Sequence, residues 1–255
     1  MTLLEACVDS YPSARAAQLG SADRIELCDN LADGGTTPSH GALALALELL
    51  TIPVFPIIRP RGGSFCYSED EIAVMERDVV HAAELGAPGL VIGALTRSGD
   101  VDEDTVGLLQ TVAEDCVLTF HRAFDVCRDP HQALETLIRL GVQRVLTSGQ
   151  RATAWEGRSL IAELVQQAGD RIVIMAGGDV DEHNAAELVR QTGVGEIHVR
   201  GTSHLNEPMV FHGHPVPFRR PLPADETERS VTEPERLLAI RAAVDVGAGR
   251  TSIRP

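Results

Sequence analysis

The chain has 255 residues, of which 44% are hydrophobic and 23% charged, as in an ordinary globular protein. Its net charge is −15 and its acidic residues are spread along the chain, which argues against a nucleic-acid partner because phosphate binding needs a basic stripe. No apolar run approaches the length of a membrane span, and the first residues lack the features of a signal peptide. With five cysteines and no Cys-x-x-Cys pair, we expect reduced thiols in a cytoplasmic protein without a membrane partner.

A repeated unit of helix, glycine and apolar strand organises the sequence. Leu85-Gly86 precedes the strand-like run Leu90-Val91-Ile92, and Leu140-Gly141 precedes Arg144-Val145-Leu146. Glycine just after a helix adopts the left-handed conformation that ends it. The pattern predicts strands near 3–7, 24–28, 54–58, 89–93, 116–121, 144–147, 172–176 and 196–199, with helices between them.

Three helix starts are also predicted. Ser68 with Glu71 and Thr232 with Glu235 have the spacing of a capping box. Asp129-Pro130 places a capping carboxylate before proline at the first helical position. A last helix is expected over 233–246.

Eight strand–helix alternations in a chain of this length predict a single (β/α)₈ TIM-type barrel over residues 1–255. An open doubly wound sheet is the alternative, but the first predicted strand is followed by Cys7-Val8-Asp9-Ser10, which is no glycine-rich dinucleotide turn. The segment 201–232 is rich in proline and charge, and we expect it to be irregular before the last helix.

Charged side chains gather at the predicted carboxyl ends of the strands, where barrel chemistry takes place. Because side chains alternate along a strand, one face is predicted to bring Glu5, Glu26, Arg59, Arg61 and His121 to one mouth. Fully structural ion pairing, for example of Glu26 with Arg59, is the alternative explanation. Asp125 follows His121 closely, so an imidazole and a carboxylate could share proton transfer.

An anion site is a second possibility at the same face. Strands six and seven end in glycine-rich turns whose backbone N–H groups could bind an anion, although glycine also serves simply to turn the chain. The cations Arg122 and Arg200 follow strands five and eight. The predicted anion-binding residues are Arg122, Ser148, Gly149, Gly177 and Gly178.

Cys7 and Cys28 end adjacent predicted strands on the same face, so their sulfurs could approach each other. Two soft thiolates suit Cu(I) or Zn(II). Spacing alone favours the other explanation, that both are small buried hydrophobic residues.

Several long motifs resemble the CutC family of copper homeostasis proteins. They include Ile57-Ile58-Arg59-Pro60-Arg61-Gly62-Gly63-Ser64-Phe65-Cys66-Tyr67-Ser68, Thr119-Phe120-His121-Arg122-Ala123-Phe124-Asp125 and Arg144-Val145-Leu146-Thr147-Ser148-Gly149-Gln150. The resemblance runs from residue 3 to about 200. It implies a cytoplasmic TIM-type barrel that forms a homo-oligomer, a dimer or tetramer, with Cys7 and Cys28 as Cu(I) ligands and no other cofactor. After His198 the bulky Arg200 departs from the family's pattern.

Two hypotheses follow. In the first, the protein binds copper through Cys7 and Cys28, which leaves the other charged residues at the mouth without a role. In the second, it is an enzyme acting on a small anionic metabolite, phosphorylated or carboxylated. There His121 would be the general acid or base, Arg59 and Arg61 would clamp the anion, and Glu26 and Asp125 would orient these groups.

Overall fold

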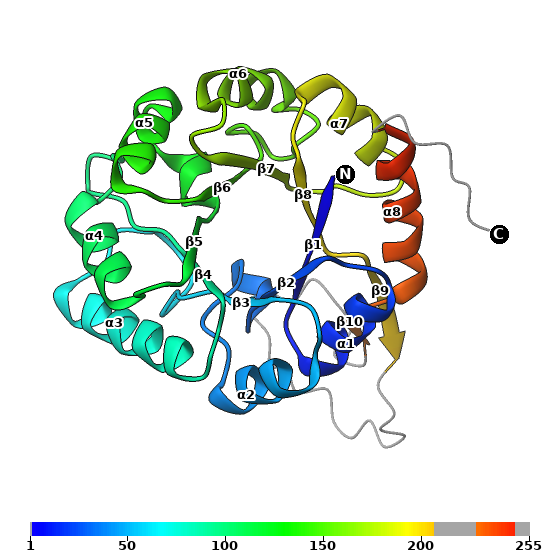
Figure 1. The fold of residues 1–255 in the computed structure, drawn as a ribbon, viewed down its shortest axis with the longest axis horizontal. Helices are drawn as coiled ribbons and strands as arrows, with labels where there is room; N and C mark the ends of the chain where they lie inside the picture. The colour runs from blue at the N-terminus through cyan, green and yellow to red at the C-terminus, as the bar shows by residue number, and fades with distance from the viewer. Residues whose placement is uncertain (1, 207–227, 248–255) are drawn as a thin grey trace, which may run out of the picture.

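Eight parallel strands form a barrel, as predicted (Figure 1). The structure is a computed structural model that describes residues 2–206 and 228–247. The strands are β1 (Leu3–Val8), β2 (Arg24–Leu27), β3 (Val54–Pro56), β4 (Gly89–Ile92), β5 (Val117–Phe120), β6 (Arg144–Thr147), β7 (Val173–Gly177) and β8 (Glu196–Val199). Their order is β3-β2-β1-β8-β7-β6-β5-β4, and a parallel bridge between Ile57 and Val91 joins the two ends of this row. The alternative of an open doubly wound sheet is thereby excluded.

Helices surround the barrel and alternate with its strands (Figure 1). They are α1 (Tyr11–Leu19), α2 (His40–Leu49), α3 (Glu69–Glu84), α4 (Glu103–Val112), α5 (Pro130–Leu140), α6 (Arg158–Ala168), α7 (Ala185–Thr192) and α8 (Pro234–Gly247). The capping box at Ser68 and Glu71 is present at the start of α3. The Asp129 carboxylate accepts from two backbone N–H groups at the start of α5, with Pro130 as the first helical residue.

The predicted capping box at Thr232 is wrong. Thr232 is the last residue of a strand, two residues before the start of α8, and its backbone N–H, which Glu235 would accept in a capping box, donates to Ser13 Oγ instead. Helix α8 begins instead at Pro234, where the absence of a backbone N–H carries no penalty.

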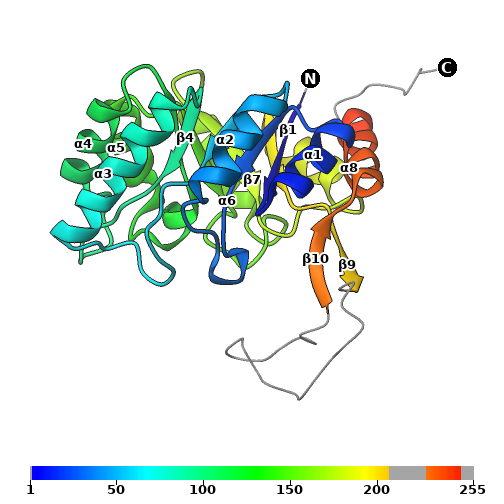
Figure 2. The same cartoon turned by 90° about the horizontal axis from the view of Figure 1, so that it is seen from below.

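The segment 201–232, expected to be irregular, begins and ends in strands. β9 (Thr202–Asn206) and β10 (Glu228–Thr232) form an antiparallel pair. This pair projects away from the barrel beneath α8 in Figure 2. The rest of the segment, 207–227, lies outside the described residues.

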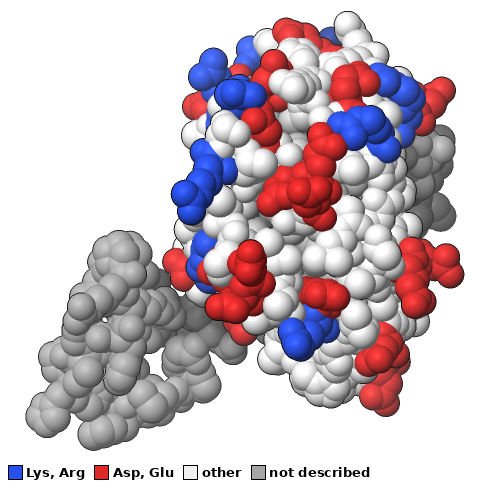
Figure 3. Space-filling view, turned by 90° about the vertical axis from the view of Figure 1, so that its left-hand side faces the viewer, with Lys and Arg blue, Asp and Glu red and all other residues white. Residues whose placement is uncertain are grey.

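The outer surface carries charges of both signs. On the face over α3 to α5, acidic side chains gather near the middle and basic side chains lie around them (Figure 3). Ion pairs join neighbouring helices there, as between Arg139 and Glu103 at 2.8 Å. Within the part of the chain that the structure describes, no helix is both long and apolar enough to cross a membrane.

Candidate functional site

A cavity of about 790 Å³ opens at the carboxyl ends of the barrel strands, and we call it the mouth cavity. Predicted site residues that line it are Cys7, Glu26, Arg59, His121, Arg122, Asp125 and Gly178. The other predicted site residues do not line it: Glu5, Cys28, Arg61, Ser148, Gly149 and Gly177. Alternation along the strands therefore located part of the lining, namely Cys7, Glu26, Arg59 and His121. The contacts of the remaining predicted residues explain why they lie elsewhere.

Cys7 and Cys28 approach each other as expected. Their sulfur atoms are 3.8 Å apart, and both side chains are buried at the ends of β1 and β2. The hydrogen bond from the Cys28 thiol, followed by a bond from His198, lowers the pKa of Cys7 well below its usual range. The same sulfur–sulfur bond and burial raise the pKa of Cys28. Of the two thiols, Cys7 is therefore the one that loses its proton more readily.

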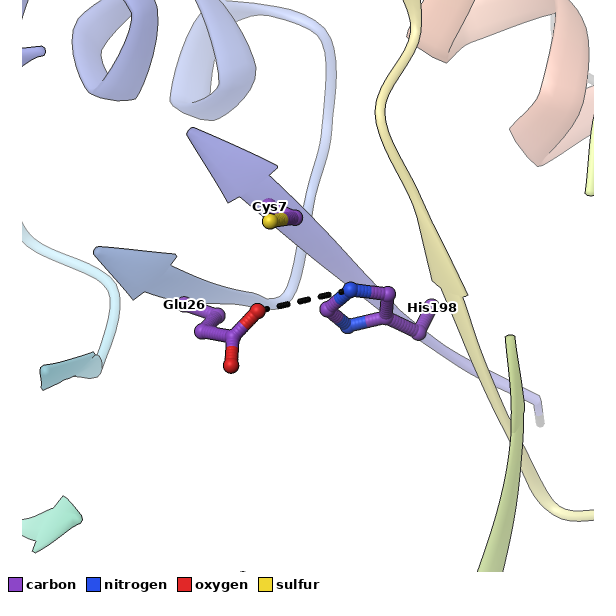
Figure 4. A group of neighbouring side chains, drawn as sticks. All are labelled: Cys7, Glu26 and His198. Carbon is purple, nitrogen blue, oxygen red and sulfur yellow. Dashed lines mark ion pairs between the residues drawn. The ribbon is translucent and has the colours of Figure 1, made fainter. Parts of the chain in front are cut away.

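A third ligand-type side chain, His198, completes a cluster with Cys7 and Glu26. Figure 4 shows the three converging from β8, β1 and β2, and His198 Nε2 lies 3.4 Å from Glu26 Oε2. One potential ligand atom from each lies within 4.8 Å of the others. His198 was predicted on the last strand, but no role was predicted for it. The sequence offered one indication of a role: His198 lies two residues after Glu196 and therefore on the same face of β8.

The electrostatics of this cluster favour a protonated imidazole. Burial alone would lower the pKa of His198, but its carboxylate and thiolate neighbours hold that pKa well above its ordinary value. Burial, followed by the Cys7 charge, raises the pKa of Glu26. A metal ion entering here would therefore displace protons from His198 and from the sulfur pair.

An ion network that sequence analysis missed fills the barrel below the cavity. Arg24 donates to Glu5 and, at 2.6 Å, to Glu196, and Arg144 binds Glu196 through two hydrogen bonds of 2.6 and 3.1 Å. All four side chains are buried. Two cations and two carboxylates balance, so the network is electrically neutral. Glu5 thus acts within the barrel interior and not at its mouth.

His121 is held rigidly at the end of β5. Its ring lies against Gly93, where an added Cβ would come within 2.3 Å of the imidazole, and it contacts Phe65 with ring centroids 4.9 Å apart. Nδ1 accepts a hydrogen bond from the Ala123 backbone N–H. Burial, and then the nearby Arg59 charge, lower the pKa of His121 to about 3. The ring is therefore neutral across the physiological range.

The two predicted clamp arginines have separate surroundings. Arg59 is buried and donates to the backbone carbonyls of Asp33, Gly35 and Gly63. Arg61 pairs instead with Glu71 of α3, with a 2.5 Å contact, and lies outside the mouth cavity. Arg59 is directed toward the loops after β2 and β3. It therefore does not form the ion pair with Glu26 that was the alternative explanation.

The turn after β6 already holds an anion, the carboxylate of Asp125. That carboxylate accepts from the Ser148 backbone N–H at 2.9 Å, from the Thr147 hydroxyl and from Gln150, and pairs with Arg122 at 2.7 Å. The Gly149 N–H is bonded to Thr147. The backbone groups of Ser148 and Gly149, which were predicted to receive an external anion, are thus bonded within the protein. At Gly177 a Cβ would lie 2.9 Å from that of His198, so this glycine makes room for the imidazole.

A parallel barrel with a polar cavity at the carboxyl ends of its strands defines a protein of the TIM-barrel class. A model of the CutC family matches residues 2–203. A CutC family protein from Pasteurella multocida is 47% identical over 213 residues, which cover 84% of this chain and 87% of the relative. A human copper homeostasis protein cutC homolog is 44% identical over 240 residues, covering 94% and 88%. A crystal structure of CutC from Streptococcus agalactiae superposes with a TM-score of 0.75 at 37% identity, covering 78% of this chain and 98% of that one.

The chain therefore belongs to the CutC family of copper homeostasis proteins. The comparisons favour this assignment over the alternative of an enzyme for a small anionic metabolite.

Proposed function

We propose that the protein binds Cu(I) through Cys7 and Cys28 at the floor of the mouth cavity. The observation that carries the proposal is the 3.8 Å separation of two buried sulfurs, of which Cys7 lines the cavity. Metal–sulfur bonds of about 2.3 Å each can span such a separation. Soft thiolate ligands select Cu(I), and the lowered pKa of Cys7 supplies one thiolate before the metal arrives.

His198 is the third group suited to the ion. Its imidazole lies beside Cys7 and is oriented by the 2.8 Å contact of Nδ1 with Glu5, which leaves Nε2 directed toward the metal-binding cluster. Such carboxylate–histidine pairs are the usual support for a metal-binding imidazole. Glu26 offers a harder oxygen ligand, which suits a borderline metal such as Zn(II) better than Cu(I).

The cellular setting is part of the same proposal. Five cysteines without a disulfide among them are typical of a reducing compartment, so we propose that the protein works in the cytoplasm. The family resemblance implies a homo-oligomer, a dimer or tetramer, which light scattering after size exclusion would measure. Copper is the partner proposed here, and it is cargo and not a group that takes part in a reaction.

A competition titration with a chromogenic Cu(I) chelator under reducing conditions tests the copper site. We expect the parent to bind one Cu(I) per chain and Cys7→Ser and Cys28→Ser each to lose at least about tenfold in affinity, since a hard hydroxyl replaces a soft thiolate. Cys116→Ser is the matched control. Cys116 precedes β5, away from the sulfur pair, and donates to the Ala87 carbonyl, a bond that serine can keep.

Two outcomes would overturn the proposal. One is equal Cu(I) affinity of the parent and both cysteine variants. The other is the absence of Cu(I) binding together with tight Zn(II) binding that depends on Glu26 and His198, which would assign the cluster to a harder ion.

A further inference from the structure

His121 carries a hydrogen-bond donor without an acceptor in the described part of the chain. Because Nδ1 accepts from the Ala123 N–H at 3.1 Å, the proton of the neutral ring lies on Nε2. Nε2 is buried and has no partner within residues 2–206 and 228–247. His121 is only 3% exposed and lines the mouth cavity. Buried polar groups are nearly always hydrogen-bonded, so this N–H calls for a ligand atom.

The tautomer decides what kind of ligand this is. A metal ion needs the lone pair of an unprotonated nitrogen, and Nδ1 has already used its lone pair on Ala123. His121 is therefore not a metal ligand in this conformation. The burial and the Arg59 charge that lower its pKa keep the ring neutral, in agreement with the geometry. The missing partner is an acceptor atom, such as an oxygen.

Arg59 supplies a second feature of an anion site, a positive charge that no carboxylate neutralises among the described residues. Arg59 is 4% exposed, and its guanidinium bonds only to neutral carbonyl groups among the described residues, at 2.8 to 3.0 Å. Nε has no partner there. Carbonyls satisfy N–H groups but do not neutralise the charge, and a buried unpaired charge is unfavourable. By contrast, Arg122 and Arg236, which also line the cavity, pair with Asp125 and Glu182.

Both groups contact the same aromatic ring, that of Phe65. The Phe65 ring centroid is 4.9 Å from Cζ of Arg59 and 4.9 Å from the centroid of the His121 ring. All three residues line the mouth cavity. We infer that this side of the cavity binds an organic carboxylate, whose oxygen accepts from Nε2 of His121 and whose charge is balanced by Arg59.

The rest of the lining specifies a monoanion with an apolar body. Five acidic side chains line the same cavity (Glu26, Asp33, Asp125, Asp179 and Asp181) against four arginines (Arg59, Arg122, Arg200 and Arg236), and this excess of negative charge disfavours a doubly charged phosphate. Leu31, Ile57, Val126, Leu146 and Val180 provide apolar surface. The cavity volume of about 790 Å³ suits a small organic molecule and far exceeds the volume of a bare metal ion. The inference concerns binding only and does not rest on the copper proposal.

The test uses two singly charged carboxylates, sodium acetate and sodium butyrate, and inorganic phosphate as probes of the metal-free full-length protein. Isothermal titration calorimetry would measure each affinity, and ¹⁵N-histidine NMR would follow the Nε2–H of His121. We expect a carboxylate to bind and to shift the Nε2 resonance. His121→Phe keeps a ring beside Gly93 but removes the donor, so its affinity should fall by about tenfold or more. His131→Phe, on the exposed surface of α5, is the matched control and should bind as the parent does.

The outcomes separate this inference from the copper proposal. Carboxylate binding retained by Cys7→Ser and lost in His121→Phe would support it, whatever the copper titration gives. It is overturned if neither carboxylate binds, if His121→Phe binds equally well, or if phosphate binds more tightly than both carboxylates. Unchanged NMR signals of the parent on addition of carboxylate would overturn it even if His121→Phe failed to fold.

Discussion

His198 Nδ1 lies 2.8 Å from Oε1 of Glu5, and this contact joins the mouth cavity to the ion network inside the barrel. Glu5 is fully buried and also accepts from Arg24. Burial alone would raise the pKa of Glu5, but the bond from His198 and the Arg24 charge together lower it to about 2. A permanent carboxylate thus lies behind the candidate metal-binding imidazole.

Glu5→Gln removes this charge and keeps the shape of the side chain. Arg24 and Arg144 would then share Glu196 as their only carboxylate among the described residues, and one buried cation would be uncompensated. We expect the free energy of unfolding to fall by about 3 kcal/mol or more, as measured by urea denaturation. NMR should also show a lower pKa for His198, because one of the groups that raise it is gone.

Glu103→Gln serves as the control for that substitution. Glu103 pairs with Arg139 on the outer surface between α4 and α5, where solvent screens the charges. Removing the Glu103 charge should therefore change the free energy of unfolding little. Equal losses of stability for the two variants would contradict a special role for the buried network.

The sequence could predict the barrel but not this network, for a physical reason. Glycines that end helices and apolar runs that form strands are local features, so they can be found in the sequence. The predicted strand 116–121, for example, corresponds to β5 at Val117–Phe120. Arg24 and Arg144 begin their strands, so from the sequence they would be expected at the far end of the barrel. The stagger of the strands pairs Arg24 with Glu5, in the middle of β1, and so moves it into the core.

The neutral state of His121 predicts an acid-sensitive contribution to stability. The unfolded chain takes up a proton at this residue near its ordinary pKa of 6.5, whereas the folded protein does so only near 3. Between these values the unfolded state binds more protons, so stability is lost as the pH falls. The slope from this group approaches about 1.4 kcal/mol per pH unit.

Urea denaturation at a series of pH values between about 7 and 5 measures this slope. His121→Phe should flatten the dependence by the contribution of one proton, while His131→Phe, which retains His121, should follow the parent. An unchanged slope in His121→Phe would show that His121 takes up its proton at the same pH in the folded protein as in the unfolded chain, which contradicts the lowered pKa.

Asp125 illustrates the limit of predicting a site from residue types. The sequence correctly placed a carboxylate near His121 and glycine-rich N–H groups after β6. It could not show that they bind each other, because the short 3₁₀ turn at Arg122–Val126 brings Asp125 across to the next strand. This contact joins the ends of two strands in the tertiary structure, so the sequence of each strand alone does not predict it.

Asp125→Asn tests that contact. The amide would present N–H donors to a turn that already donates from Thr147, Ser148 and Gln150, and Arg122 would lose its 2.7 Å partner. We expect a loss of about 2 kcal/mol or more in the free energy of unfolding. Asp129→Asn is the control, because asparagine caps a helix as well as aspartate does. Equal stability of the two variants would contradict a structural role for the Asp125 carboxylate.

Gly93 tests how tightly the His121 ring is held. Its position directly after β4 leaves no room for a methyl group, since a Cβ would lie 2.3 Å from the imidazole. Gly93→Ala should therefore displace the ring and destabilise the protein by about 1 to 3 kcal/mol. Gly107→Ala is the control. Nothing lies within 4 Å of a Cβ at that helical position, so alanine should be neutral or stabilising there by up to about 1 kcal/mol.

A double-mutant cycle identifies the ring as the cause of that loss. In the background of His121→Ala the imidazole is absent, and Gly93→Ala should then lose most of its effect on the free energy of unfolding. Strict additivity of the two substitutions would mean that the methyl group at position 93 clashes with something other than His121. Strong coupling would show that β4 and β5 together fix the ring, and with it the direction in which Nε2 faces the mouth cavity.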